Sequence, residues 1–391
     1  MSDVSAEPPK AGSKPLWGLA GWLGVVLLLL LGLAILVRSL TPSLPTYAGK
    51  RVDDWFEQAV RMTSTEYSES ARRAFEEMEE EAIPFLVRWV NARYTPFGKA
   101  YAWVRAHLPD RLRGALPRPR TYQDFQDRRV RALILIREIA AAQRWKPGNG
   151  KSIAPLVLSA ICSALRDPSG EVRGAAADAV GLLGPQAAPT ISDLIQLTQD
   201  ANERPACAAI MALGLVGPAA SNAVPVLIWN AAHATGIKRL LAVQSLGEIG
   251  SPAQSAAPVL VSILLTNDNT IPANADGGEG LRVKAARALA EIGSTPGDAV
   301  PTLMAMTKGT NQWARWFASI ALWNRDRQNA SLQAQVIEGL RSTNRLGVLM
   351  SLGSLGTNAV AFIPEIHRLT NDPFARHMAR RTLQRIQGSV P

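Results

Sequence analysis

The sequence predicts an all-α protein, a right-handed α-solenoid of stacked helix pairs preceded by one N-terminal transmembrane helix. Three observations lead to this prediction. Residues 15–37 contain no charged side chain and are almost wholly apolar. Glycines recur at positions 184, 217 and 250, which are 33 residues apart. After each of these glycines, a short linker leads to an apolar residue followed by proline.

The composition bounds the class of protein before any motif is considered. The chain has 391 residues and a formal net charge of +10, with many Ala, Leu and Gly and few strand-like runs. This composition is unusual for a compact α/β enzyme. Part of the positive charge is concentrated, because residues 93–126 carry seven Arg or Lys against two Asp. Such a basic segment suits an acidic partner, either nucleic acid or an anionic membrane.

Residues 15–38 are predicted to be a transmembrane signal anchor, after an N-terminal tail of residues 1–14. A hydrocarbon core of about 30 Å needs about 20 helical residues, and this run has that length. Trp17 and Trp22 lie near its start, as aromatic residues do at membrane interfaces. The alternative is a cleaved signal peptide, whose apolar region would be about half as long. A short tail before a long domain favours a single-pass protein with its repeat domain outside the cytoplasm, although Lys and Arg flank the run on both sides.

The repeats predict an array over residues 127–391. In the clearest first helix the apolar residues form one stripe, which consists of Val172, Ala175, Ala176, Ala179, Val180 and Leu183. A two-helix unit cannot bury this stripe alone, so successive units must share one core. Each unit is expected to contain a helix, a glycine C-cap and a helix that starts with proline. The apolar–proline pairs are Ala188-Pro189, Val224-Pro225, Ala257-Pro258, Val300-Pro301 and Ile363-Pro364, with Ala154-Pro155 and Ile83-Pro84 upstream.

Less regular segments flank and extend the clear repeats. Residues 39–68 are interpreted as a linker and lead-in helix, and residues 69–126 as a degenerate first repeat with a basic insertion. Downstream, residues 313–326 and 346–356 keep the repeat pattern in weaker form.

An arginine recurs eleven residues before the glycine of most units, or before the equivalent position. These arginines are Arg129, Arg173, Arg239, Arg282, Arg315 and Arg345. Together with turn residues such as Asp167, Asp200 and Asp372, they indicate side chains that bridge adjacent repeats. The pattern from Asp167-Pro168 through Val172-Arg173 to Ala188-Pro189 resembles HEAT repeats of the bilin-lyase type. The resemblance implies that turn aspartates and helical arginines form a structural ladder along the stack.

A second resemblance concerns the segment from Tyr47 to Trp55. It is similar to the lead-in of bacterial membrane-anchored HEAT-repeat proteins, whose activity is undefined.

Interruptions of the repeat are the candidate functional segments, because a solenoid binds through its surface and through what breaks its period. The first is the basic insertion at residues 94–120, whose candidate partner-binding residues are Arg105, Arg111, Arg113, Arg118 and Arg120. Aromatic residues such as Phe97 and Trp103 add apolar surface. Basic and aromatic residues together suit an anionic lipid surface. A solvated loop, a packed segment, and contact with protein or nucleic acid are the alternatives.

Two further interruptions are a polar loop and an aromatic helix. The loop at residues 267–280 is rich in side-chain oxygens but lacks the EF-hand order, so a surface connection is expected rather than a metal site. In the helix, Trp313, Trp316 and Phe317 stand at helical spacing. Core packing is the main interpretation of this face. An exposed part of it, at Trp313 and Trp316, is the candidate partner-binding anchor.

No catalytic, cofactor or metal site is predicted. The four histidines lack metal-ligand spacing, and the sequence has no Gly-x-Ser-x-Gly, CxxC or phosphate-loop motif. Cys162 and Cys207 are expected to be small buried apolar side chains, with a disulfide left open.

These observations favour a non-catalytic, membrane-anchored scaffold that binds an unknown protein partner. The family resemblance implies one alternative, a lyase or another ligand-binding enzyme acting in the solenoid groove. The basic insertion offers another, binding of anionic lipid or nucleic acid. The membrane anchor argues against nucleic acid.

Overall fold

A computed structural model describes residues 44–61, 69–145, 153–266 and 280–388. The predicted anchor at residues 15–38 and all but the last residue of the polar loop at 267–280 lie outside these described ranges. Thr46–Pro391 forms one compact unit, and the architecture below is that of this unit.

The described part is helical apart from one short hairpin, in which β1 (Thr46–Tyr47) pairs antiparallel with β2 (Lys50–Arg51). The helices that precede the array are α2 (Val52–Arg61), α3 (Glu69–Met78), η1 (Glu79–Ala82), α4 (Ile83–Val90), α5 (Pro96–Ala106) and α6 (Asp110–Ala115). The first helices of successive pairs are α7 (Tyr122–Trp145), α9 (Gly170–Leu183), α11 (Glu203–Val216), α13 (Gly236–Ile249), α15 (Leu281–Glu291), α17 (Gln312–Trp323), α19 (Arg345–Leu355) and α21 (Arg376–Ile386). The second helices are α8 (Ala154–Leu165), α10 (Ile191–Leu197), α12 (Val224–His233), α14 (Ala257–Leu265), α16 (Val300–Thr307), α18 (Ala330–Arg341) and α20 (Ile363–Arg368). The 3-10 segments within the array are η2 (Gly184–Thr190), η3 (Gly217–Ala223), η4 (Ser251–Ala256), η5 (Gly297–Ala299), η6 (Gly356–Phe362) and η7 (Leu369–Asn371).

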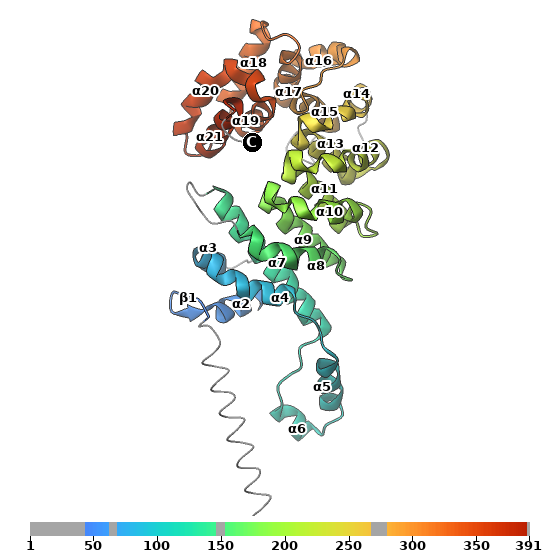
Figure 1. Cartoon of the computed structure of the whole chain (residues 1–391), viewed down its shortest axis with the longest axis vertical. Helices are drawn as coiled ribbons and strands as arrows, with labels where there is room; N and C mark the ends of the chain where they lie inside the picture. The colour runs from blue at the N-terminus through green and yellow to red at the C-terminus, as the bar shows by residue number, and fades with distance from the viewer. Residues whose placement is uncertain (1–43, 62–68, 146–152, 267–279, 389–391) are drawn as a thin grey trace, which may run out of the picture. The chain divides into compact units, whose positions relative to one another are not determined.

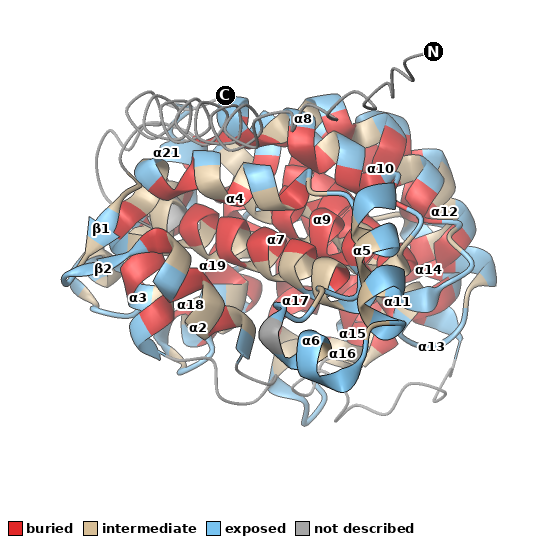
Figure 2. Cartoon of the chain, turned by 90° about the horizontal axis from the view of Figure 1, so that it is seen from below, coloured by how far each residue is buried: buried red, intermediate tan, exposed pale blue. Residues whose placement is uncertain are grey.

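The first helices pack on one another in chain order, from α7 through α9, α11, α13 and α15 to α17, and α19 packs on α21 (Figure 1). Each second helix packs on a first helix beside it. The predicted apolar stripe of α9 is buried along its whole length, which confirms that neighbouring units share one core. Figure 2 shows buried residues running through α7, α9 and the helices that follow.

Glycine ends several first helices, as the sequence predicts. Gly184, Gly217, Gly250 and Gly356 have φ between 53° and 78°, a left-handed conformation that side chains with a Cβ rarely adopt. Proline lies in the first turn of α4, α8, α12, α14, α16 and α20. One predicted start is wrong: Pro189 lies inside η2, and α10 begins two residues later at Ile191.

Two described stretches are long and apolar enough to cross a membrane, Glu203–His233 and Arg345–Asn371. Each contains a first helix, a 3-10 segment and a second helix of the array, and the second stretch also includes η7. About half of each apolar window is buried inside the protein, 56% and 44% respectively. Buried repeat helices therefore account for this hydropathy.

Candidate interaction surfaces

The basic insertion forms a hairpin of two helices, α5 and α6, and we call residues 95–118 the α5–α6 hairpin. Arg105 of α5 and Arg113 of α6 each donate to carbonyls at the end of the other helix. Arg105 Nη2 donates to the Arg113 carbonyl oxygen at 2.8 Å, and Arg113 Nη2 donates to the Leu108 and Ala106 carbonyl oxygens at 3.0 and 3.3 Å. Tyr101 Oη also donates to the Pro117 carbonyl oxygen at 2.7 Å. Four carbonyls at and just beyond the C-terminal ends of the two helices, those of Ala106, Leu108, Arg113 and Leu116, thus accept from an arginine of the other helix.

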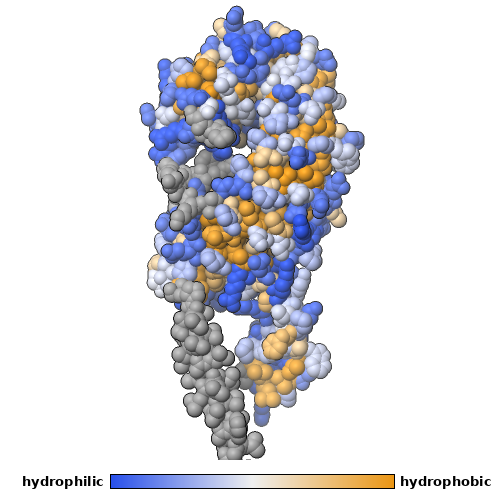
Figure 3. All heavy atoms as spheres, in the orientation of Figure 1, coloured by the Kyte–Doolittle hydropathy of each residue, from blue (hydrophilic) through white to orange (hydrophobic). Residues whose placement is uncertain are grey.

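The outer face of this hairpin is apolar and exposed. Phe97 is 81% exposed and Trp103 65% exposed, and Val104, Leu112 and Leu116 are also exposed. No residue of α5 is buried. Figure 2 shows α6 and much of α5 as exposed, and Figure 3 shows hydrophobic residues gathered over the same two helices.

The base of the hairpin is tied to the array by aromatic and charged contacts. Tyr94 lies 5.5 Å from Phe125 between ring centroids. Arg120 stands over the Trp89 ring at 5.2 Å and lies 3.6 Å from the Glu57 carboxylate. Arg120 is therefore placed at the base rather than on the hairpin.

The five arginines selected from the sequence thus have three different surroundings. Arg105 and Arg113 hold the hairpin together, and Arg120 lies at its base. Arg111 and Arg118 are exposed to solvent.

The aromatic helix is α17, and it is mainly a core element. Trp316 is 1% exposed and packs beside Gly339, where a Cβ would stand 3.0 Å from its ring. Trp313 is half-buried and stacks on Phe317 at 5.7 Å. Burial leaves Trp316 no surface for a partner, so the core-packing interpretation accounts for this residue.

Four exposed apolar residues also lie on second helices of the array. They are Leu156 on α8, Trp229 on α12, Leu265 on α14 and Met304 on α16, each about half exposed, and we call them the second-helix row. Trp229 stacks on His233 with ring centroids 5.1 Å apart. None of these residues belongs to the candidate segments that interrupt the repeat pattern. The available signal was a tryptophan two residues from Leu227 and Ala231, which places it opposite the buried face of α12.

The arginine–aspartate ladder predicted along the stack is present. Arg129 pairs with Asp167, Arg173 with Asp200 and Arg345 with Asp372, each at 2.6 Å. Where a unit lacks the aspartate, the arginine donates to a carbonyl at the end of the preceding helix, as Arg239 Nε does to Ala231 at 2.9 Å. The resemblance to HEAT repeats implied this structural role, and the contacts confirm it.

Buried ionisable groups gather where α13, α15 and α19 meet. Glu291 accepts from Arg287 Nε at 2.9 Å and from Ser351 Oγ at 2.8 Å. Glu248 Oε1 accepts from Gln244 Nε2 at 2.8 Å, while its Oε2 is buried without a hydrogen-bond partner. Burial raises the pKa of Glu248, against the opposing hydrogen bond from Gln244. Among the described residues, no three His, Cys, Asp or Glu side chains are grouped so that they could hold a metal ion.

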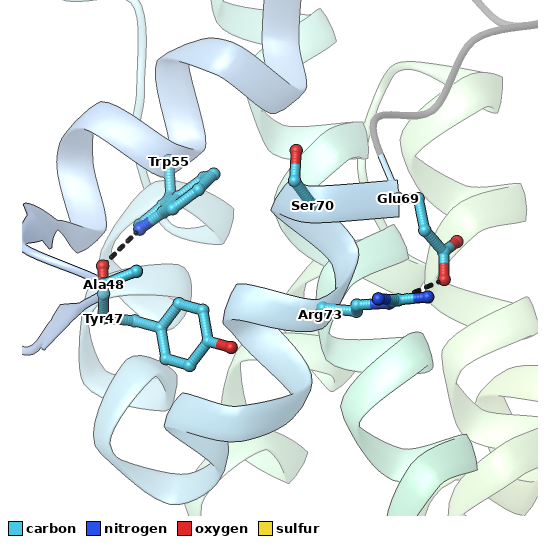
Figure 4. Close-up of a pocket in the computed structure, with 6 residues that line it drawn as sticks. All are labelled: Tyr47, Ala48, Trp55, Glu69, Ser70 and Arg73. Atoms are coloured by element: carbon cyan, nitrogen blue, oxygen red, sulfur yellow. Dashed lines mark hydrogen bonds and ion pairs between the residues drawn. The ribbon is translucent and has the colours of Figure 1, made fainter.

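Two cysteines and a pocket near β1 are the remaining groups that could carry chemistry in the described part of the chain. Cys162 and Cys207 are free and half-buried, and burial raises the pKa of both thiols. Tyr47, Ala48, Trp55, Glu69, Ser70 and Arg73 line the pocket (Figure 4). Its Trp55 Nε1 donates to the Tyr47 carbonyl at 3.1 Å, and Arg73 Nε donates to Glu69 at 3.0 Å. The indole N–H of Trp55 and the guanidinium of Arg73 are thus already engaged within the pocket wall.

Two family models match the chain within the array. The HEAT repeats model matches residues 158–236 and 191–275, and the PBS lyase HEAT-like repeat model matches residues 281–308. Residues 158–275 and 281–308 therefore contain HEAT repeats, which build a helical scaffold. These matches confirm the resemblance of the sequence to HEAT repeats of the bilin-lyase type.

Several solved structures are similar to this chain. An engineered protein has 18% identity and a TM-score of 0.40, over 86% of this chain and 98% of its own. The complex of CpcE and CpcF of phycocyanin lyase from Nostoc sp. PCC7120 has 16% identity and a TM-score of 0.34, over 81% and 99%. The karyopherin Kap121p, bound to the extreme C-terminus of the protein phosphatase Cdc14p, has 13% identity and a TM-score of 0.36, over 86% and 41%. No curated protein matches the sequence. At these TM-scores, the likenesses carry no argument about function.

Proposed function

We propose that this chain is a non-catalytic scaffold whose HEAT array binds a protein partner, while residues 15–38 tether it to a membrane. The observation that carries the proposal is the second-helix row. Single exposed apolar residues are common on protein surfaces. Here four large ones recur on the second helices of one stack, and stacked repeats expose continuous surfaces of this kind to their partners.

Trp229 is the central residue of the proposed binding surface. It is 53% exposed, and its stacking on His233 restrains the ring before any partner arrives. A restrained side chain loses less entropy on binding. Tryptophan is also enriched among the residues that supply most of the binding energy at interfaces. Since α12 packs on α14, a partner that covers Trp229 also reaches the neighbouring unit.

The lyase alternative draws its support from the match to the PBS lyase HEAT-like repeat at residues 281–308. No cluster of described side chains favours it over a scaffold. Copurification of a bound pigment or other small ligand with the full-length chain would favour the lyase.

The test begins with affinity capture on the detergent-solubilised full-length chain at low and high salt. The recovered protein is then purified, and its Kd is measured for the wild type, for Trp229→Ala/Met304→Ala, and for Phe374→Ala as control. Phe374 is 83% exposed but lies in the turn between η7 and α21 and is not one of the residues of the second-helix row. We expect one protein at both salt concentrations, with binding weakened at least about tenfold by the double substitution and unchanged in the control. Equal binding by the double variant, or no protein partner at either salt, contradicts the proposal.

A further inference from the structure

We propose that the α5–α6 hairpin is a membrane-surface element that inserts its exposed apolar face among the headgroups of an anionic bilayer. This surface is separate in sequence from the second-helix row. This proposal can therefore be tested independently of any protein partner.

The first support is the exposure of large apolar side chains on α5. Tyr101 and Arg105 point to the α6 side of the hairpin, where both donate to main-chain carbonyls. Trp103 lies on the opposite side of the helix with Val104 toward its edge, whereas Phe97 lies one turn before Tyr101 on the same side, and all three are exposed. A surface helix of a water-soluble domain normally turns its apolar stripe toward the core, but no residue of α5 is buried. The exposed apolar side chains indicate that this surface meets an apolar medium.

The second support is that polar bonds hold the hairpin, so its apolar face is not needed as a core. Helix ends carry carbonyls that hydrocarbon leaves unsatisfied, at a high cost in free energy. Arg113 donates to carbonyls at the end of α5, and Arg105 donates to carbonyls at the end of α6. These four carbonyls therefore keep their donors when the hairpin enters the interfacial region.

The third support is the charge at the edge of the apolar face. Lys99, Arg111 and Arg118 are exposed, and within the described part of the chain no ion pair or hydrogen bond of their side chains is present. The one carboxylate of the hairpin, Asp110, lies 3.4 Å from Arg113. Unpaired cations beside an apolar face match the charge of anionic headgroups. Tryptophan, here Trp103, prefers the same interfacial depth.

The experiment reports on the hairpin itself, because the full chain can associate with a bilayer in other ways. The full-length protein carries Cys162→Ser and Cys207→Ser, with Ala100→Cys on the exposed face of α5 labelled by the polarity-sensitive fluorophore NBD. It is reconstituted into nanodiscs of phosphatidylcholine, with or without phosphatidylglycerol, some containing a spin-labelled lipid quencher. A second protein with the label at Gln254→Cys, an exposed residue of η4, is the control site.

We expect a blue-shifted, lipid-quenched signal at position 100 in anionic discs, a weaker one in neutral discs, and none at position 254. Phe97→Ser/Trp103→Ser is expected to lower the inserted-to-free ratio at least about tenfold. Each substitution of Lys99, Arg111 or Arg118 by Gln is expected to lower it roughly fivefold. Phe374→Ser, which removes an equally exposed aromatic residue elsewhere, should leave the ratio unchanged.

A solvent-like signal at position 100 in both kinds of disc overturns the proposal. Equal insertion into neutral and anionic discs overturns the electrostatic part of the proposal. If the label at position 100 does not respond to lipid but is shielded from solvent by a bound protein, the hairpin binds that protein instead. Circular dichroism checks that each variant is folded. The charge variants alter only exposed side chains, so they test the proposal even if the double apolar variant misfolds.

Discussion

At the scale of single residues, the clearest consequence of the fold is the state of Glu248. Its carboxylate lies against Gly214 of the preceding first helix, where a Cβ would collide with Oε2 and with the backbone of Ser245. The close approach of α11 and α13 therefore requires glycine at position 214. It also removes Oε2 from water, with no hydrogen-bond partner in exchange. Burial consequently raises the pKa of Glu248 above its ordinary value of 4.5.

This shift predicts a pH-dependent stability. Because the folded state holds the proton more tightly than the unfolded state, the contribution of Glu248 is complete below pH 4.5 and is lost as pH rises through the raised pKa. Glu248→Gln should abolish this fall and raise the free energy of unfolding at pH 8 by about 1 kcal/mol. Urea unfolding between pH 4 and pH 8 measures it. Parallel pH profiles for the variant and the wild type would show that folding does not raise the pKa of Glu248.

At the scale of elements, the arginine–aspartate ladder divides into buried and exposed rungs. The Asp167 side chain is fully buried and Arg129 is almost so, and Asp167 also accepts from Arg93. Burial opposes ionisation of Asp167, but hydrogen bonds from Arg129 and the Ser169 amide outweigh it and lower the pKa of the carboxyl. In the rung between Arg345 and Asp372, each of the two side chains is about one-fifth exposed.

The two rungs should therefore respond differently to the same substitution. Asp167→Asn leaves the Arg129 guanidinium buried without its charge partner, and we expect it to cost about 3 kcal/mol of unfolding free energy. Asp372→Asn, the matched control, should cost about 1 kcal/mol or less. The wild-type contribution of Asp167 is present above the unfolded pKa of an aspartate and is lost as pH falls through the lowered one. Urea midpoints for both variants at pH 7 check the difference, and equal losses would refute the assignment.

Sequence periodicity predicts these elements well because glycine caps, proline starts and the ladder arginines are local signals repeated with the unit. Pro189 shows the limit of these local signals. It and Thr190 belong to η2, so α10 begins only at Ile191, and the proline alone does not predict this delay. Trp316 shows another, because its spacing fits a buried and an exposed face equally until Gly339 is placed against it. The roles of Arg105 and Arg113 depend on which carbonyls lie within reach once α5 and α6 pack together. Composition does not reveal which carbonyls these are.

At the scale of the whole array, one contact between helices departs from nearest-neighbour stacking. α15 packs on α17, as expected, but also on α19, and Ser351 Oγ donates to Glu291 at 2.8 Å across 60 residues of sequence. In a simple solenoid each pair touches only its neighbours, and its stability is a sum of local terms. The skipped contact joins α15, α17 and α19 into one group of mutually packed helices, and α21 packs on α19.

Opening of this group should therefore be concerted, and amide hydrogen exchange can measure it. Ser351→Ala removes the hydroxyl from the buried Glu291, and we expect exchange to accelerate roughly fivefold in α15 as well as in α19, with α9 and α11 unchanged. Ser354→Ala is the control, because the Ser354 hydroxyl lies on the same helix and donates to the Met350 carbonyl of that helix. Acceleration confined to α19 would mean that its units open independently. Acceleration in both helices would mean that α15 and α19 open together as one cooperative unit, although 60 residues of sequence separate Glu291 from Ser351.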